Sequence, residues 1–158
     1  DTQNNVLDAF RLGANRAKAV NPGHTVNFQV SIHSTDHELR VQHTGITRLL
    51  PLEEIAEAAK DLHDITGRKM ALSFVLHAGS VIDPKILNRV FPPEHTIISL
   101  RPVYSLTTKP MNPNDLINLY SQLRADGRDV VYMPPSQDDT IDGRPIELDN
   151  MRAQSLGL

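Results

Sequence analysis

Hydrophobic and polar residues follow two periods along the chain, one typical of helices and one typical of strands, and the two periods alternate. Apolar residues recur at helical spacing from Leu7 to Ala17, and this pattern stops at the breaker sequence Asn21-Pro22-Gly23. The segment VNFQVSI, residues 26–32, then alternates strictly between apolar and polar side chains. The chain is therefore predicted to begin with a helix, followed by a strand that has one apolar and one polar face.

Three more pairs of a helix and a strand follow in the same order. The helices are predicted to run from Pro51 to a stop at Gly67, from Pro84 to Phe91, and from Pro113 to a stop at Gly127. The strands are predicted at MALSFVLH (70–77), TIISLRP (96–102) and DVVYM (129–133). The remaining segment, 136–158, is polar and rich in turn residues, and it is predicted to be a loop and a weakly ordered tail.

The connections between the predicted strands reach the dozen or so residues that parallel pairing requires, so the fold class is α/β. Strands of doubly wound sheets are apolar on both faces, whereas the first three strands here keep one face small or polar. This pattern favours a (β/α) barrel whose polar face is turned toward the lumen. We therefore expect residues 1–143 to form a parallel four-stranded (β/α) half-barrel with an N-terminal helix, and residues 144–158 to form a polar tail.

Composition narrows the possible functions. The chain has 158 residues and a formal net charge of -3, so a single domain is expected, and the overall charge does not indicate a nucleic-acid binder. It contains no cysteine, which excludes disulfides, thiolate nucleophiles and cysteine-held iron–sulfur clusters within these residues. No apolar run approaches the roughly 20 residues that span a membrane, so we expect a soluble, cytoplasmic protein. Because the chain starts at Asp1 without a methionine, we expect it to belong to a longer parent protein.

Polar and ionisable side chains come at the ends of the predicted strands, on the same predicted face. His33 follows the first strand, Ser73 and His77 belong to the end of the second, and Arg101 lies near the end of the third. Active sites of β/α barrels lie at the C-terminal ends of the strands, so these residues are candidates for a ligand site. The alternative interpretation is that strand ends are simply places where polar residues are tolerated.

The segment SIHSTDHELR, residues 31–40, is the most distinctive in the chain because donors, acceptors, histidines and a guanidinium lie together just after a strand. His33, His37 and His43 resemble a metal site in composition, but ordinary loop histidines are the favoured interpretation, and no metal is expected. The acidic loop QDDTID, residues 137–142, offers paired carboxylates, although aspartates in such loops usually serve turns. Serine-hydrolase and nucleotide-loop motifs are absent from the sequence.

Several of these segments together resemble a known family. FQVSIHSTDHELR, then GRKMALSFVLHAGSVIDP, then TIISLRPVY, and finally SQDDTIDG are similar in order and spacing to the second half of the radical S-adenosylmethionine (SAM) enzymes that methylate adenosine at carbon 2 of RNA. The most specific part is the run containing Ser31, His33, Ser34, Asp36 and Arg40. The resemblance covers about residues 26–143, and it implies a partial TIM-like radical SAM barrel.

The resemblance implies that Ser31, Ile32 and His33 contact SAM, with Arg101 or Tyr104 in the place of an asparagine that the family brings to the cofactor. We further expect Ser73, His77, Arg40 and Tyr104 to line the lumen of the barrel in the intact parent. The family's acidic loop is followed by a cysteine, where this chain has Gly143-Arg144. The cysteines that hold the family's [4Fe–4S] cluster belong before this chain, in the longer parent.

The resulting hypothesis is that the chain is the C-terminal part of a radical SAM methyltransferase-like enzyme, inactive alone and completed by the N-terminal half of its parent or by another chain. RNA is a partner by family analogy only, no membrane is expected, and no catalytic residue is assigned. One alternative is a non-catalytic module that binds an anion or metabolite through Arg40, His33, His77 and Arg101. Another alternative is a scaffold that completes a partner's barrel through its open sheet edges.

Overall fold

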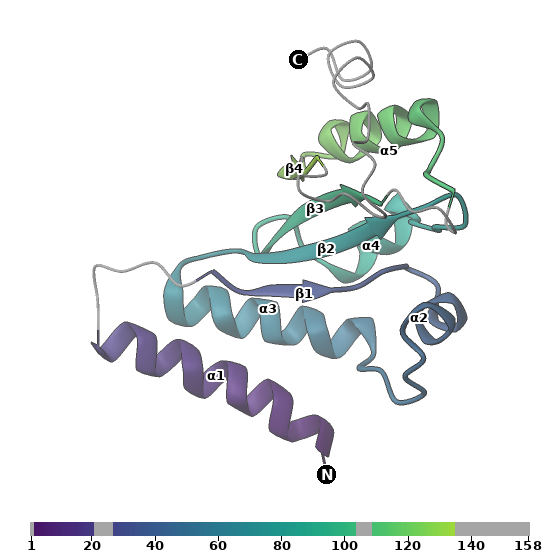
Figure 1. Ribbon diagram of the computed structural model, residues 1–158. Coiled ribbons are helices and arrows are strands. Elements are labelled where there is room, and N and C mark those ends of the chain that lie inside the picture. The colour runs from purple at the N-terminus through teal and green to yellow at the C-terminus, as the bar shows by residue number, and fades with distance from the viewer. Residues whose placement is uncertain (1, 21–26, 104–108, 135–158) are drawn as a thin grey trace, which may run out of the picture.

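A computed structural model describes residues 2–20, 27–103 and 109–134, with side chains from residue 8 onward. In chain order the elements are α1 (Thr2–Val20), β1 (Gln29–Ser31), α2 (His37–Thr44), α3 (Leu52–Thr66), β2 (Met70–Leu76), α4 (Pro84–Val90), β3 (Thr96–Pro102), α5 (Pro113–Ala125) and β4 (Val130–Tyr132). The strands form one parallel sheet in the order β1-β2-β3-β4 (Figure 1). The α/β class and the parallel four-stranded sheet predicted from the sequence are confirmed.

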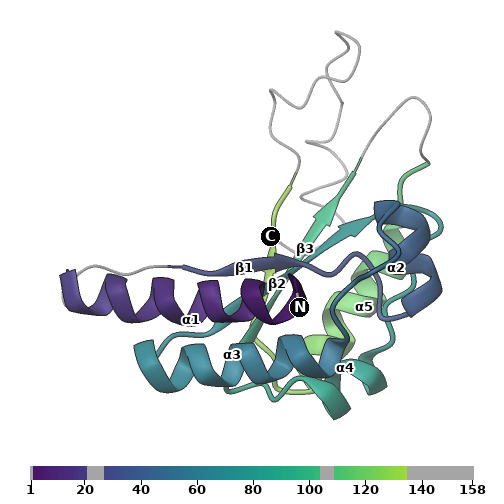
Figure 2. The ribbon, with the colours of Figure 1, turned by 90° about the horizontal axis from the view of Figure 1, so that it is seen from below.

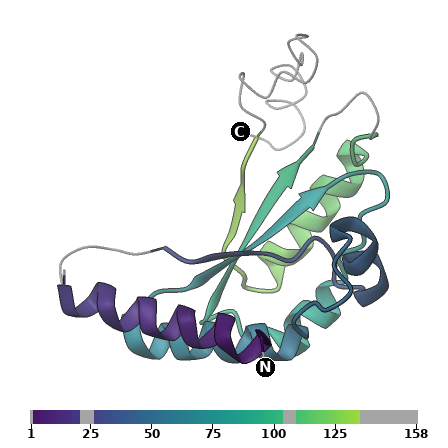
Figure 3. The ribbon, with the colours of Figure 1, turned by 60° about the horizontal axis from the view of Figure 1, so that its bottom comes forward.

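Each strand pairs with the next strand along the chain, which is the connectivity of a barrel wall. In a doubly wound sheet the strand order reverses at a switch point, and no such reversal occurs among the described strands. Right-handed crossovers between successive parallel strands place the connecting helices on one side of the sheet. Figures 2 and 3 show α1, α3, α4 and α5 gathered on one side, which leaves the opposite face for the polar residues.

The helix-facing side of the sheet carries the hydrophobic core. Met70, Leu72, Phe74 and Leu76 alternate along β2, and each is at most 1% exposed. Each such buried side chain stabilises the fold by roughly 1.5–3 kcal/mol relative to an exposed one. The apolar face that the two-residue period predicts is therefore the face that holds the sheet on its helices.

Local signals in the sequence set the helix ends. Helix α3 begins after Pro51 and ends at Gly67, which has a φ of 71° that a residue with a Cβ rarely adopts. Asp83 caps α4 by accepting a hydrogen bond from the N–H of Lys85, and Asn112 caps α5 in the same way. The predicted positions of these helices are confirmed.

Helix α2 was not predicted, because residues 37–44 were interpreted as a loop. Asp36 accepts a hydrogen bond from the N–H of Leu39 at 2.9 Å, and Gly45 ends the helix with a φ of 69°. The histidines at 37 and 43 therefore lie on a helix, so the prediction of loop histidines is wrong for these two, whereas His33 lies in a loop as predicted. An aspartate cap and a closing glycine with eight residues between them are enough for a two-turn helix even without a strong apolar period.

The two outer strands are shorter than predicted. Strand β1 covers Gln29–Ser31 of the expected 26–32, and β4 covers Val130–Tyr132 of the expected 129–133. Each pairs with one described neighbour only, so fewer backbone hydrogen bonds hold its ends. The predicted tail and the predicted boundary at 143/144 lie outside the described residues.

Helix α1 packs along α3 (Figure 1). Arg11 forms an ion pair with Asp61 at 2.7 Å, and Lys18 donates a hydrogen bond to the carbonyl of Ile65. The ring of Phe10 lies 5.7 Å from that of Phe28, just before β1. Within the described ranges, no helix is both long and apolar enough to cross a membrane.

Candidate functional site

A row of three serines crosses the face of the sheet opposite the core. Strand register aligns Ser31 with Ser73, and Ser73 with Ser99. Ser31 is exposed, whereas Ser73 and Ser99 are each 4% exposed. The Oγ of Ser99 is buried and has no hydrogen-bond partner in the part of the chain that the structure describes. A buried hydroxyl without a hydrogen-bond partner lowers the stability of the folded chain. A ligand that forms a hydrogen bond with Ser99 would remove this cost.

Arg101 lies on the same face, two residues after Ser99 along β3. Its side chain is exposed, and its Nη2 is 3.9 Å from the sulfur of Met133. The backbone of Arg101 is in register with Val75 of β2. The guanidinium therefore lies one step closer than the serine row to the C-terminal end of the sheet, with its charge free of any described carboxylate.

His33 lies two residues after β1, in a strained turn. Its φ is 66°, and the N–H of Ser34 donates to the carbonyl of Ile32 across it at 2.8 Å, which closes a γ-turn. Backbone in this region costs of order 1–3 kcal/mol and is found more often at functional sites. Burial lowers the pKa of His33, and the electrostatic effects of the neighbouring His43 and Arg40 lower it further. The imidazole is therefore neutral at pH 7.

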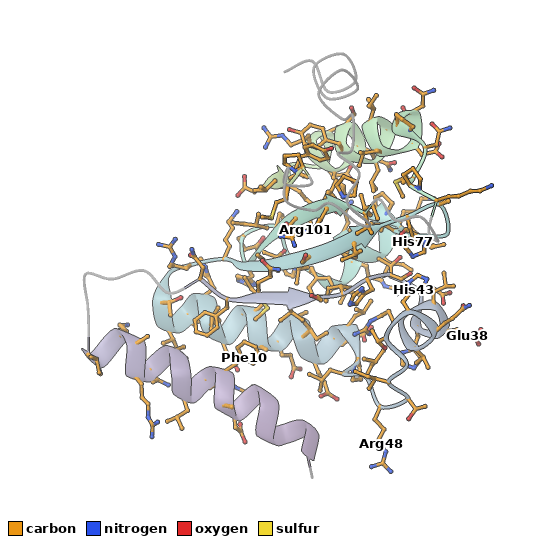
Figure 4. All side chains as sticks on the ribbon, in the orientation of Figure 1. Phe10, Glu38, His43, Arg48, His77 and Arg101 are labelled. Carbon is orange, nitrogen blue, oxygen red and sulfur yellow. The ribbon has the colours of Figure 1, made fainter. Side chains whose placement is uncertain are left out.

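His77 follows β2 and meets His43 of α2 edge-on, with ring centroids 4.6 Å apart (Figure 4). The N–H of Gly79 donates to Nδ1 of His77 at 3.1 Å, which leaves the proton of the neutral ring on Nε2. Burial lowers the pKa of His77, and His43 lowers it further. The Nδ1 of His43 is buried without a described partner. Two neutral imidazoles, at positions 33 and 77, thus flank the same end of the sheet.

The other predicted site residues lie in different places. The side chain of Ile32 is buried on the core side at 1% exposure, and its N–H and carbonyl bond to Ser73 and Ser34, so it has little left to offer a ligand. Arg40 lies on α2 rather than on the sheet, and it lines a separate cavity. Tyr104 and the acidic loop 137–142 lie outside the described residues.

Two residues of this region were not among the predicted site residues. Ser99 was visible in the sequence as the polar-face residue two positions before Arg101, but nothing indicated that its hydroxyl is buried. His43 was obscured because α2 was not predicted, and only the helix brings its ring to His77. No group of three or more histidine or acidic side chains in the described ranges is arranged to hold a metal ion.

The face therefore combines hydroxyl groups, neutral imidazoles and one guanidinium at the C-terminal end of parallel strands. Hydroxyls and neutral imidazoles both donate and accept hydrogen bonds, and the guanidinium only donates. Such a set suits a polar ligand with carboxylate, hydroxyl or heterocyclic nitrogen groups. It lacks a described acid near enough to the histidines to form an ion pair with them, so it offers binding more clearly than proton transfer.

Comparison with known proteins gives one structural match and no sequence match. No family model matches the chain, and no curated protein sequence matches it. A crystal structure of a radical SAM methyltransferase from Sphaerobacter thermophilus superposes on it with a TM-score of 0.61 at 21% identity. The match covers 78% of this chain and 38% of that chain. At this identity the likeness shows a shared fold, a partial (β/α) barrel, and the chain spans little more than a third of the protein it matches.

Proposed function

We propose that this chain supplies the SAM-binding strand ends of a radical SAM methyltransferase-like enzyme. The observation that carries the proposal is the serine row on the face away from the helices, which leads to the two neutral histidines at the strand ends. The structural likeness to a radical SAM methyltransferase supports this proposal as far as the fold is concerned. The segments 26–40 and 68–83, which resemble the RNA adenosine C2-methyltransferases, favour RNA as the substrate class.

The residues of this face suit SAM in several respects. Ser99 offers a buried hydroxyl without a described partner, and Ser31 offers an exposed one at the edge strand. Strand β1 pairs with β2 alone among the described strands, so its other edge presents backbone donors and acceptors. The amino acid, ribose and adenine parts of SAM all need such groups. SAM supplies the radical and methyl-transfer chemistry of these enzymes when it is bound beside a reduced iron–sulfur cluster.

In this proposal each side chain binds or orients. Ser31 and Ser99 hydrogen-bond the cofactor, and His33 is held by its γ-turn in a fixed direction at the end of β1. His77, protonated on Nε2, donates from the end of β2. Arg101 places a positive charge where a carboxylate or a substrate phosphate approaches.

The iron–sulfur cluster does not fit these residues. The chain has no cysteine, and thiolates are the usual ligands of such clusters. In this proposal the ligands of a cluster lie outside these 158 residues. The chain alone is proposed to bind SAM and not to turn it over.

The test is SAM binding by the 158-residue chain, measured by calorimetry. Ser99→Ala is expected to weaken binding about three- to tenfold, the range of one hydrogen bond, while it stabilises the free chain by about 1 kcal/mol by removing an unpartnered hydroxyl. If Ser99 had only a structural role, its replacement by alanine would not both weaken SAM binding and stabilise the free chain. Ser121→Ala, at an exposed position on α5, is the matched control and changes neither.

The methyltransferase part is tested with the parent protein prepared without oxygen. Iron–sulfur absorption, reductive cleavage of SAM and methylation of adenine at carbon 2 in RNA are expected together. Binding of SAM without methylation of RNA contradicts the proposed substrate and leaves the cofactor site intact. No SAM binding by either the chain or the parent contradicts the site itself.

A further inference from the structure

Arg40 is a buried cation without a carboxylate partner. It is 3% exposed, and its Nη1 donates to the carbonyl of Leu50 at 3.0 Å. Its Nε is buried and has no hydrogen-bond partner among the described residues. The ion pairs of the described ranges do not include it, and Glu53 acts on it only at longer range. Burial lowers its pKa, but a guanidinium stays charged at neutral pH. One carbonyl oxygen is therefore the described acceptor of a buried positive charge that has no ion-pair partner among the described residues.

Arg128, the other buried arginine of the described residues, has more acceptors than Arg40, although its Nη1 is likewise buried without a described partner. It is 2% exposed, and it donates to the side chain of Asn88 at 2.8 Å and to the carbonyls of Leu87 and Phe91 at 2.6 Å each. Three good acceptors thus surround Arg128, whereas one surrounds Arg40. Arg40 therefore has fewer protein acceptors than Arg128, and its guanidinium lines a cavity where a ligand can supply them.

A cavity of about 240 Å³ lies beside Arg40, between α2, the start of α3 and α4. It is much larger than the roughly 30 Å³ that one water occupies in the liquid. Arg89 of α4 lines it together with Arg40, while Glu53 is its one lining carboxylate. The formal charge of the lining is therefore positive at neutral pH.

The N-terminus of α3 opens onto the same cavity through Leu52 and Glu53. The residue before the helix is Pro51, whose side chain cannot cap it, and the described residues provide no acceptor for the N–H groups of Leu52 and Glu53. By contrast, Asp36 caps α2 and Asp83 caps α4. Free N–H groups at a helix start, with the helix dipole behind them, favour an anion.

We propose that this cavity binds a phosphate group, either free phosphate or the phosphate of a larger ligand. A tetrahedral oxyanion accepts hydrogen bonds from several directions at once, so it can take the α3 N–H groups, the free edge of Arg40 and the charge of Arg89 together. The cavity is separate from the serine row and does not depend on SAM binding. Neither the resemblance nor the structural match assigns it a ligand.

The test is titration of the 158-residue chain with inorganic phosphate, followed by the amide signals of Leu52 and Glu53 in nuclear magnetic resonance spectra. Both signals are expected to shift in a saturable way. Arg89→Gln, at an exposed position that the fold tolerates, weakens binding about two- to fivefold, and Glu53→Gln tightens it by a similar factor. Arg40→Gln weakens it about tenfold or more if the variant folds.

Arg16→Gln on the exposed face of α1 is the matched control, since it removes the same charge far from α3's first turn. Saturable shifts that Arg89→Gln weakens and Arg16→Gln does not support the proposal. Unshifted amides of Leu52 and Glu53, or equal weakening by both variants, overturn it. Adenosine monophosphate and acetate then identify the ligand class. If adenosine monophosphate binds more tightly than phosphate, the cavity binds the phosphate group of a larger ligand, and if the two affinities are equal, it binds free phosphate. If acetate binds as tightly as phosphate, the choice of phosphate is overturned.

Discussion

The backbone of His33 gives the sharpest prediction of this structure. Among the described residues it is the one non-glycine residue with a positive φ, at 66°. A residue with a Cβ pays roughly 1–2 kcal/mol in this region, which glycine avoids. Glycine in turn loses about 0.5–1 kcal/mol more backbone entropy on folding than alanine does. The difference leaves the His33→Gly variant more stable than the His33→Ala variant by about 0.5–1 kcal/mol.

Comparing these two variants isolates the backbone, because both remove the whole imidazole. The assay is urea unfolding followed by circular dichroism, with the transition midpoint compared at equal slope. Ser31 of β1 provides the control, since it lies in extended backbone two residues earlier. There Ser31→Gly is expected to be less stable than Ser31→Ala by about 0.5–1 kcal/mol, which is the opposite order.

The reasoning is refuted if the His33→Ala variant is as stable as the His33→Gly variant while the Ser31 pair shows its expected order. Both variants lack the imidazole, so both are expected to bind SAM more weakly than the unchanged chain, whichever of the two is the more stable.

Three further predictions concern the packing, the caps and the titration of the chain. Arg128→Met removes the described donor to the carbonyl of Phe91 and to the side chain of Asn88, and one of the two donors to the carbonyl of Leu87, so it is expected to lower the free energy of unfolding by about 3 kcal/mol in urea titrations. Asp36→Ala removes the cap of α2 and is expected to lower it by about 1 kcal/mol, with a loss of helical signal in circular dichroism. Burial lowers the pKa of His33 and His77 in the folded chain, so the unfolded chain binds more protons as the pH falls below about 6.5. The free energy of unfolding is therefore expected to fall from pH 7 toward pH 5, and less steeply in His77→Gln.

Matched variants separate these effects from general damage. Arg124→Met removes an exposed arginine from α5, and Glu38→Ala changes an exposed residue in the first turn of α2, so each is expected to change stability by less than about 0.5 kcal/mol. An Arg128→Met chain as stable as the Arg124→Met chain contradicts the role of the buried guanidinium. An Asp36→Ala chain that unfolds like Glu38→Ala contradicts the cap, and an unchanged pH slope in His77→Gln contradicts the lowered pKa.

The alternation of apolar and polar residues was sufficient to predict the class, the parallel strands and the polar face. Met70, Leu72, Phe74 and Leu76 have to be buried together, because a shift of one residue exposes all of them. Helix α2 escaped prediction because its signals are local caps rather than an apolar period, and its eight residues bury Arg40 instead of an apolar stripe. Short elements that are held by caps and polar contacts are the least visible in a sequence.

The order of residues along the chain already places the small and polar side chains on one face of each strand, because side chains alternate between the two faces with a period of two residues. It also places His33, His77 and Arg101 near the strand ends, where parallel strands bring them to the same edge of the sheet. Which polar groups lack hydrogen-bond partners becomes visible only in the folded chain. Three features depend on the register and packing of elements that are separated in the sequence. They are the alignment of Ser73 with Ser99, the ring contact between His43 and His77, and the single described hydrogen bond of the buried Arg40. Hydrogen-bond satisfaction is a property of a residue's surroundings, so it appears only when the elements are packed together.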